Sequence, residues 1–246
     1  MPDPALLVFA LVVVAVSATL QGTTGFGYNI LVVPLLALFI DPKTVIPAVI
    51  LHNIVIDLAV LVTAWRFVNL RRIWLLLVAG LIGTPIGVLL QSIIDPDPLR
   101  LLIGAAVAFT GLVMLAGYKR PIGNEYVASG FAGSIGGTMN GLIGMAGPPV
   151  ILLFANQSMP PREFRANIVT YFTLITIIAI ASFGIEGALT DDVFELALAT
   201  VPATTAGVIL GIRLHGRVPL ELFYKASLVL VVAAGITVLV AGLVAL

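Results

Sequence analysis

The chain has 246 residues, of which 60% are hydrophobic and 10% are charged. Soluble domains carry about 25% charged residues, so this composition excludes an ordinary soluble domain and indicates a protein of the lipid bilayer. The formal net charge is zero, which gives no electrostatic reason to expect a nucleic-acid partner. Cysteine is absent, so disulfides, thiolate metal sites and cysteine nucleophiles are excluded, and no pattern indicates a cofactor or a resident metal.

Two long apolar runs are interrupted by glycine-rich sequences. The first run, 5–40, contains Gln21-Gly-Thr-Thr-Gly-Phe-Gly-Tyr-Asn29, and the second, 125–157, contains Asn140-Gly-Leu-Ile-Gly-Met-Ala-Gly-Pro-Pro149. Interrupted hydrophobic segments at corresponding places in two halves are the best sequence indication of a binding site in a secondary transporter.

Each interrupted run is followed by three continuous apolar stretches, each near the length of about 20 residues that a membrane span needs. The two halves align with an offset of 118 to 121 residues, which places Gly25 on Gly144 and Thr84 on Thr204. We therefore predict an all-α polytopic membrane protein with two repeats, 1–119 and 120–246. The predicted spans are 45–65, 73–94, 99–117, 165–185, 193–213 and 221–246.

Each interrupted run either crosses the bilayer or turns back inside it. The piece after the first break has about 11 residues and is roughly 16 Å long, about half of the hydrocarbon core. If the runs cross, the lysines and arginines divide five against seven between the two faces, whereas re-entrant hairpins divide them ten against two. The positive-inside rule favours the hairpins. The ten residues on the predicted cytoplasmic face are Arg66, Arg71, Arg72, Lys119, Arg120, Arg162, Arg165, Arg213, Arg217 and Lys225.

The hairpin model has a consequence for the orientation of the repeats. One hairpin and three spans make an odd number of crossings, so the second repeat is inverted relative to the first and both termini are extracytoplasmic. Only Lys43 and Arg100 then lie on the outer face, against the trend. The sequence thus predicts two inverted repeats, each a glycine-broken re-entrant helical hairpin plus three transmembrane helices.

The hairpin tips are the predicted substrate site. Non-helical backbone at this depth must be buried in protein or line a wet cavity. The N-terminus of each second half-helix carries a positive dipole end and free N–H groups, which favour a small anion, and glycine lets the backbone approach a ligand closely. The alternative is that the glycines only permit tight helix packing. The candidate contacts are Gln21, Gly22, Thr23, Thr24, Gly25, Gly27, Asn29, Asn140, Gly141, Gly144, Gly147 and Pro148.

The span after the first hairpin carries His52, Asn53 and Asp57. A carboxylate inside a membrane is expensive and is a functional hypothesis by default, so Asp57 is the predicted proton carrier, with His52 and Asn53 as its helpers. Asn53 and Asp57 are four residues apart on one helix face, so a merely structural hydrogen bond between them is the alternative. Another interpretation makes these three residues the ligands of a transported cation or metal.

The corresponding span of the second half has no acid and no histidine. Its polar residues include Asn167, Thr170 and Tyr171, predicted as further substrate contacts, as well as Thr173 and Thr176. Arg165 begins this span on the predicted cytoplasmic side, where it would attract anions. The alternative for Arg165 is an ordinary positive-inside anchor.

The segments GTTGFGYNILVVPLL and GLIGMAGPPVILLF, each after an apolar helix, resemble the TauE/SafE family of sulfite and sulfonate exporters over essentially the whole chain. The chain departs from the family's richer glycine runs at Tyr28 and Asn29 and at Pro148 and Pro149. The resemblance implies a permease of a prokaryotic cytoplasmic membrane that moves sulfite, sulfoacetate or a related organosulfur anion, usually outward.

Taken together, the patterns predict a secondary transporter of a small anion that works by alternating access and is coupled to protons. A homodimer is compatible with this prediction, but no residue pattern specifies one. An intramembrane enzyme is the remote alternative, because the sequence has no HExxH, no GxSxG and no cysteine.

Overall fold

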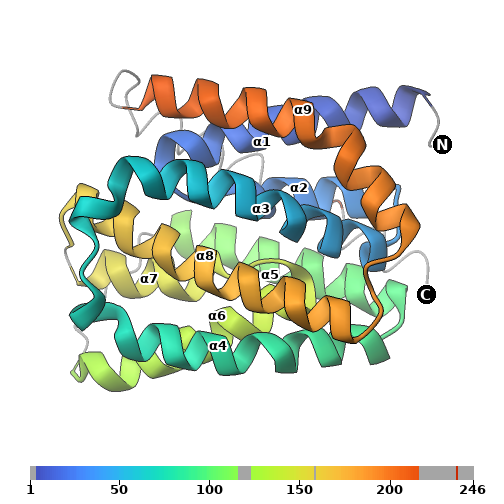
Figure 1. Cartoon of the computed structure of the whole chain (residues 1–246). Helices are drawn as coiled ribbons and strands as arrows, with labels where there is room; N and C mark the ends of the chain where they lie inside the picture. Colours follow the sequence, from blue (N-terminus) through green and yellow to red (C-terminus); the bar gives the residue numbers. More distant parts are fainter. Residues whose placement is uncertain (1–3, 116–122, 158, 216–236, 238–246) are drawn as a thin grey trace.

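The computed structural model describes residues 4–115, 123–157, 159–215 and 237, and these residues are helical almost throughout (Figure 1). The predicted last span, 221–246, lies outside the described residues except for position 237. The elements in chain order are α1 (Pro4–Thr24), α2 (Tyr28–Ala37), α3 (Pro42–Ala64), the 3-10 turn η1 (Trp65–Phe67), α4 (Leu70–Ile93), α5 (Pro96–Leu115), α6 (Glu125–Ile143), α7 (Gly147–Asn156), α8 (Pro161–Ile185) and α9 (Asp191–Leu214).

The prediction of an all-α polytopic membrane protein is confirmed. In the described part of the chain, six helices are long and apolar enough to cross a membrane, namely α1, α3 with its 3-10 turn, α4, α5, α8 and α9. The last five correspond to the predicted spans 45–65, 73–94, 99–117, 165–185 and 193–213. The protein is therefore a multi-pass membrane protein.

Two helix breaks lie where the glycine-rich sequences predicted them, between α1 and α2 and between α6 and α7. Gly25, Gly27 and Gly144 have φ values of 91°, 107° and 71°, in a region that residues with a Cβ rarely adopt. The helices that follow, α2 and α7, have 10 residues each. Each is about 15 Å long, half of a hydrocarbon core of about 30 Å.

The two helix pairs that flank the breaks, α1 with α2 and α6 with α7, open toward opposite ends of the bundle (Figure 1). At one end, the Phe9 ring at the start of α1 packs edge-on against Phe39, which follows α2, with ring centroids 5.5 Å apart. At the other end, a salt bridge of 3.6 Å between Arg72 and Glu163 joins the start of α4 to the start of α8. There the backbone N–H of Asn69 also donates to Asn167 Oδ1.

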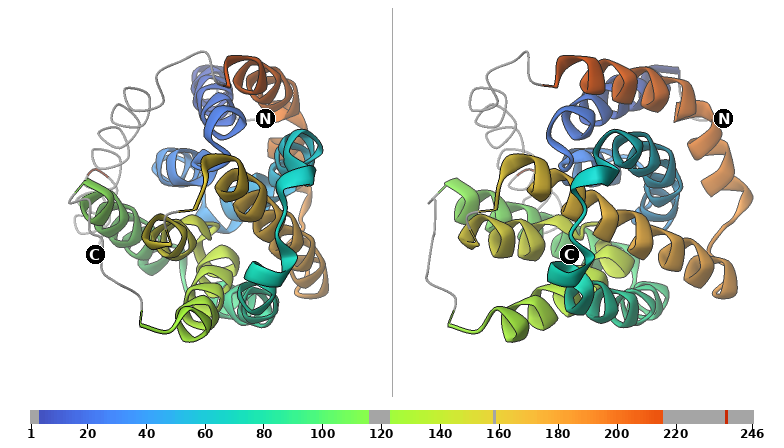
Figure 2. Two further views of the ribbon diagram at one scale, coloured as in Figure 1. Left: turned by 90° about the vertical axis from the view of Figure 1, so that its left-hand side faces the viewer. Right: turned by 60° about the vertical axis from the view of Figure 1, so that its left-hand side comes forward.

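Two tightly packed helix pairs flank the middle of the bundle. Seen from the end, α1 lies beside α9 on one side and α4 beside α6 on the opposite side (Figure 2). Glycine at the crossings allows close backbone approach. A Cβ at Gly211 of α9 would lie 2.3 Å from Thr19 O of α1, and one at Gly141 of α6 would lie 2.3 Å from Thr84 O of α4. Both halves of the chain therefore use the same packing device.

We predict that Gly87→Val strongly destabilises the protein, because a Cβ at Gly87 would lie 2.1 Å from Thr138 O on α6. Overpacking of this kind costs about 1–3 kcal/mol or more. Thermal unfolding of the purified protein in detergent measures the loss. Gly130→Ala is the matched control, since its Cβ would meet nothing closer than 3.8 Å. Equal melting temperatures for the two variants would contradict this account of the helix crossing.

Candidate functional site

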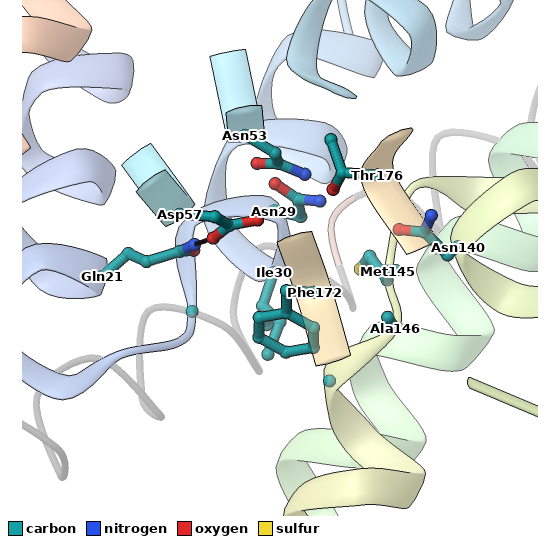
Figure 3. A pocket seen from close by; sticks show the side chains of 12 residues that line it. Gln21, Asn29, Ile30, Asn53, Asp57, Asn140, Met145, Ala146, Phe172 and Thr176 are labelled. Carbon is teal, nitrogen blue, oxygen red and sulfur yellow. Dashed lines mark hydrogen bonds between the residues drawn. The ribbon is translucent and has the colours of Figure 1, made fainter. Parts of the chain in front are cut away.

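A small polar cavity lies where the two helix breaks meet (Figure 3). Seven predicted site residues line it, from α1, α2, α3, α6 and α7, together with five residues that were not chosen from the sequence. The complete lining is Gln21, Gly27, Asn29, Ile30, Asn53, Asp57, Asn140, Met145, Ala146, Gly147, Phe172 and Thr176.

The lining residues come in corresponding pairs from the two halves. At an offset of 119 residues, Gln21 corresponds to Asn140 and Asp57 to Thr176. Applying the same offset to Asn53 gives Phe172 and to Gly27 gives Ala146, so three of the five missed residues follow from the repeat. The others, Ile30 and Met145, are apolar and lie in or beside the breaks, where no chemical signal distinguishes them.

Gln21 links the buried carboxyl group of Asp57 to the first break. Its Nε2 donates to Asp57 Oδ1 over 2.7 Å, and its Oε1 accepts from the N–H of Tyr28 over 3.1 Å. Tyr28 is the first residue of α2, so Gln21 occupies a backbone donor at the N-terminus of that half-helix. Asp57 is fully buried and bonds to Gln21 rather than to Asn53. The expected structural pair of Asn53 and Asp57 is therefore not what holds this carboxyl group.

Four buried polar atoms of the cavity lining have no hydrogen-bond partner. Buried polar groups are nearly always paired, because an unpaired group keeps its desolvation cost. A polar ligand, an ion or water in this cavity would satisfy such atoms. They are Asn29 Oδ1, Asn53 Oδ1, Asp57 Oδ2 and Asn140 Nδ2.

The backbone donors at the tips divide into two groups. Some are engaged locally: the N–H of Gly25 donates to Gln21 O, and that of Gly144 donates to Asn140 O. Others belong to residues of the cavity lining and have no hydrogen bond to any described residue. The second group comprises the N–H groups of Gly27, Ala146 and Gly147.

His52 lies outside the cavity, between α2 and α9. Its Nδ1 is 2.9 Å from the hydroxyl of Tyr28, and its Nε2 is 2.9 Å from Ala197 O and 3.2 Å from the Thr200 hydroxyl. Both ring nitrogens are thus used in helix packing. In the described residues, no group of three or more His, Cys, Asp or Glu side chains could hold a metal ion. The interpretation as a metal carrier with His52 as a ligand has no geometric support here.

Arg165 is buried beside the first break rather than in the cavity. Its Nη2 donates to Gly22 O, near the C-terminus of α1, over 2.7 Å, and its Nη1 donates to the Thr63 hydroxyl over 3.1 Å. Cations are favourable at helix C-termini. The arginine stem packs against Gly25, and at the corresponding place in the other half Ile46 packs beside the second break. Arg165 therefore supports one tip only.

The remaining predicted contacts pack within the protein and do not line the cavity. Gly22 and Gly141 lie at helix crossings, as the alternative interpretation of the glycines proposed. The Thr23 hydroxyl donates to Gly211 O, and the Tyr171 hydroxyl donates to Gly133 O. The complete set outside the cavity, besides His52 and Arg165, is Gly22, Thr23, Thr24, Gly25, Gly141, Gly144, Pro148, Asn167, Thr170 and Tyr171.

Half-helices that end inside an apolar bundle and enclose a polar cavity are the architecture of secondary membrane transporters. Comparison with known proteins agrees with this class. Residues 9–238 match the family described as sulfite exporter TauE/SafE, and the chain belongs to this family. It is a family of transporters and not of enzymes.

Two relatives illustrate the family. The chain is 26% identical over 200 residues to the "Probable sulfite/organosulfonate exporter TauE" of Cupriavidus necator, with 78% of each chain covered. It is 28% identical over 179 residues to the "Probable inner membrane transporter protein TsaS" of Comamonas testosteroni, covering 70% of this chain and 73% of the relative. No solved structure matches.

We predict that Gln21→Met lowers the stability of the protein by about 2 kcal/mol, because it leaves Asp57 Oδ1 and the N–H of Tyr28 unpaired. Chemical or thermal unfolding in detergent measures the change. Gln91→Met is the matched control, since Gln91 is a buried amide outside the cavity whose Nε2 has no partner. If both variants lose the same stability, the link through Gln21 contributes nothing specific.

Proposed function

We propose that the protein exports sulfite or an organosulfonate such as sulfoacetate across the cytoplasmic membrane of a prokaryote. The anion would bind in the cavity between the two tips and leave by alternating access. The observation that carries this proposal is the set of unpaired buried polar groups at the meeting point of two half-helices. The printed names of the two relatives support sulfite and organosulfonates as the substrate class.

The proposed topology has two inverted repeats, 1–119 and 120–246, with both termini extracytoplasmic. The opposite openings of the two helix pairs that flank the breaks support it. The two basic residues on the outer face also have a local explanation. Lys43 Nζ donates to Ser92 O at the end of α4, and Arg100 Nε donates to Ala37 O at the end of α2. Cations are favourable at helix C-termini, whichever side of the membrane they face.

The anion-binding groups in this proposal are donors of the cavity lining. Asn140 Nδ2 is buried and unpaired, and the backbone N–H groups of Gly27 and Ala146 belong to corresponding positions of the two tips. Hydrogen bonds to ionised oxygens are the strong ones, and the half-helix dipoles add to them. Arg165 lies near the start of α8, on the proposed cytoplasmic side, and its charge would favour the approach of an anion from that side.

Coupling to protons follows from the charge of Asp57. An ionised Asp57 would repel an anion in the same cavity, and little screening is available in a buried site. It would also hold Gln21 by a charge-assisted hydrogen bond, and Gln21 then keeps the N–H of Tyr28 occupied. A proton on Asp57 removes the repulsion and weakens the hydrogen bond between Asp57 and Gln21. Proton and anion would therefore bind together and move in the same direction, which the combined gradients determine.

We predict that Asp57→Asn removes the pH-gradient drive but keeps anion exchange. In proteoliposomes, uptake of radiolabelled sulfite driven by a pH gradient should fall by about tenfold or more, to the level of protein-free vesicles, because the proton-carrying group is gone. Exchange of internal for external sulfite should continue, since asparagine resembles the neutral carboxyl group. Asp97→Asn, which removes an exposed partner of Arg100, is the control and should behave as wild type. Normal pH-driven uptake by Asp57→Asn would contradict the coupling mechanism.

A further inference from the structure

Three of the four unpaired atoms in the cavity are oxygens, which an anion cannot satisfy. They belong to Asn29, Asn53 and Asp57. Their polar ends point toward one another, with the hydroxyl-bearing Thr176 beside them, while Asn140 lies on the far side of the cavity (Figure 3). The cavity thus has a side rich in oxygen acceptors and a separate side that carries a free donor.

Hydrogen bonds fix the orientation of this oxygen cluster. Asn29 Nδ2 donates to Gly144 O of the second break, which leaves Asn29 Oδ1 directed into the cavity. Both polar atoms of the Gln21 amide are engaged, with Nε2 donating to Asp57 Oδ1 and Oε1 accepting from the Tyr28 N–H. Asp57 Oδ1 therefore has a partner, and Asp57 Oδ2 is left unpaired. The acceptor character of the cluster therefore follows from contacts with both breaks.

The described residues supply no positive charge to this carboxyl group. No basic side chain lines the cavity. The guanidinium of Arg165 is bonded to Gly22 O and the Thr63 hydroxyl, and the His52 ring is bonded between α2 and α9. A buried carboxylate without a counter-charge is costly.

A proton alone serves only part of the cluster. A proton on Asp57 Oδ2 makes one O–H donor, which serves the amide oxygen of either Asn29 or Asn53, and the other amide oxygen then depends on the single O–H of Thr176. A small cation accepts electron pairs from all three oxygens at once and balances the single negative charge. Hard cations take oxygen ligands, and unwound segments of transporter helices coordinate Na⁺.

We propose that Asp57 Oδ2 and the amide oxygens of Asn29 and Asn53 form a binding site for a small monovalent cation of the Na⁺ class. Thr176 supplies a fourth oxygen from α8. A single carboxylate balances one charge, which favours a monovalent ion over a divalent one. The cation and the proton compete for Asp57. This inference rests on the proposed function, because it names a second ion that can accompany the anion.

The test compares sodium with a bulky cation on the purified full-length protein. Melting temperatures are measured in NaCl, KCl or choline chloride at equal ionic strength, at pH 8 and at pH 5.5. Ligands that bind only the folded state raise its stability by mass action. Na⁺ should raise the melting temperature at pH 8 above the values in K⁺ and choline. The apparent Na⁺ affinity should fall by about tenfold per pH unit where the proton occupies Asp57.

Three variants make the test specific. Asp57→Asn should abolish the rise in melting temperature caused by Na⁺. Asn53→Leu keeps the carboxyl group and should lower ²²Na⁺ binding at least several-fold. Gln91→Leu changes a buried amide outside the cavity and should keep both the effect of Na⁺ on the melting temperature and ²²Na⁺ binding. Equal melting temperatures in Na⁺, K⁺ and choline at pH 8 would overturn the proposal, as would a sodium effect that persists in both Asp57→Asn and Asn53→Leu.

The outcome is separable from that of the proposed function, because anion binding is measured in choline medium with sulfite added as its Tris salt. A response to sulfite without any response to sodium would overturn the cation site alone. A sodium response with no response to sulfite or any organosulfonate would support the cation site and overturn the proposed export function.

Discussion

Unpaired backbone groups cannot face hydrocarbon, and this constraint governs the site of the protein. Each glycine-rich break interrupts a helix inside the bundle and frees polar groups that need partners. Some of these groups form local hydrogen bonds, such as the one from the Tyr28 N–H to Gln21 Oε1. The carbonyl of Gly144 in the second break accepts a hydrogen bond from Asn29, which lies just after the first break. Four of the buried polar atoms that stay unpaired in the described residues line one cavity, which is the candidate site for a polar ligand.

The two halves provide the same scaffold but different chemistry. Each of the two parallel helix pairs with glycine at its crossing, α1 with α9 and α4 with α6, joins one helix of each half. Within the cavity, however, the acid Asp57 corresponds to Thr176, and Gln21, which is engaged on both sides, corresponds to Asn140, which has a free donor. Outside it, Arg165 supports the first tip where Ile46 packs beside the second. Approximate symmetry thus builds the pocket, and its departures from symmetry separate a carboxyl group from an unpaired hydrogen-bond donor.

Much of this arrangement could be predicted from the sequence because it depends on local chemistry. Glycine clusters inside apolar runs locate the breaks, and the four-residue spacing of Asn53 and Asp57 places both on the face that lines the cavity. Other assignments depend on tertiary contacts. Sequence does not distinguish Gly27, with φ of 107°, from Gly22, which makes room for α9. The polar character of Thr170 and Tyr171 likewise does not show that they face away from the cavity, whereas Phe172 and Thr176 on the same helix follow only from their correspondence to Asn53 and Asp57.

The most direct test of the account is the binding of sulfite to the cavity itself. Titration calorimetry on the purified protein should detect sulfite binding to the wild type and to Asn156→Leu, whose amide lies outside the cavity near the end of α7. Asn140→Leu removes the free donor and should lose binding while it remains folded. Absence of sulfite and organosulfonate binding to the wild type, or unchanged binding to Asn140→Leu, would contradict the claim that the two tips together hold the anion.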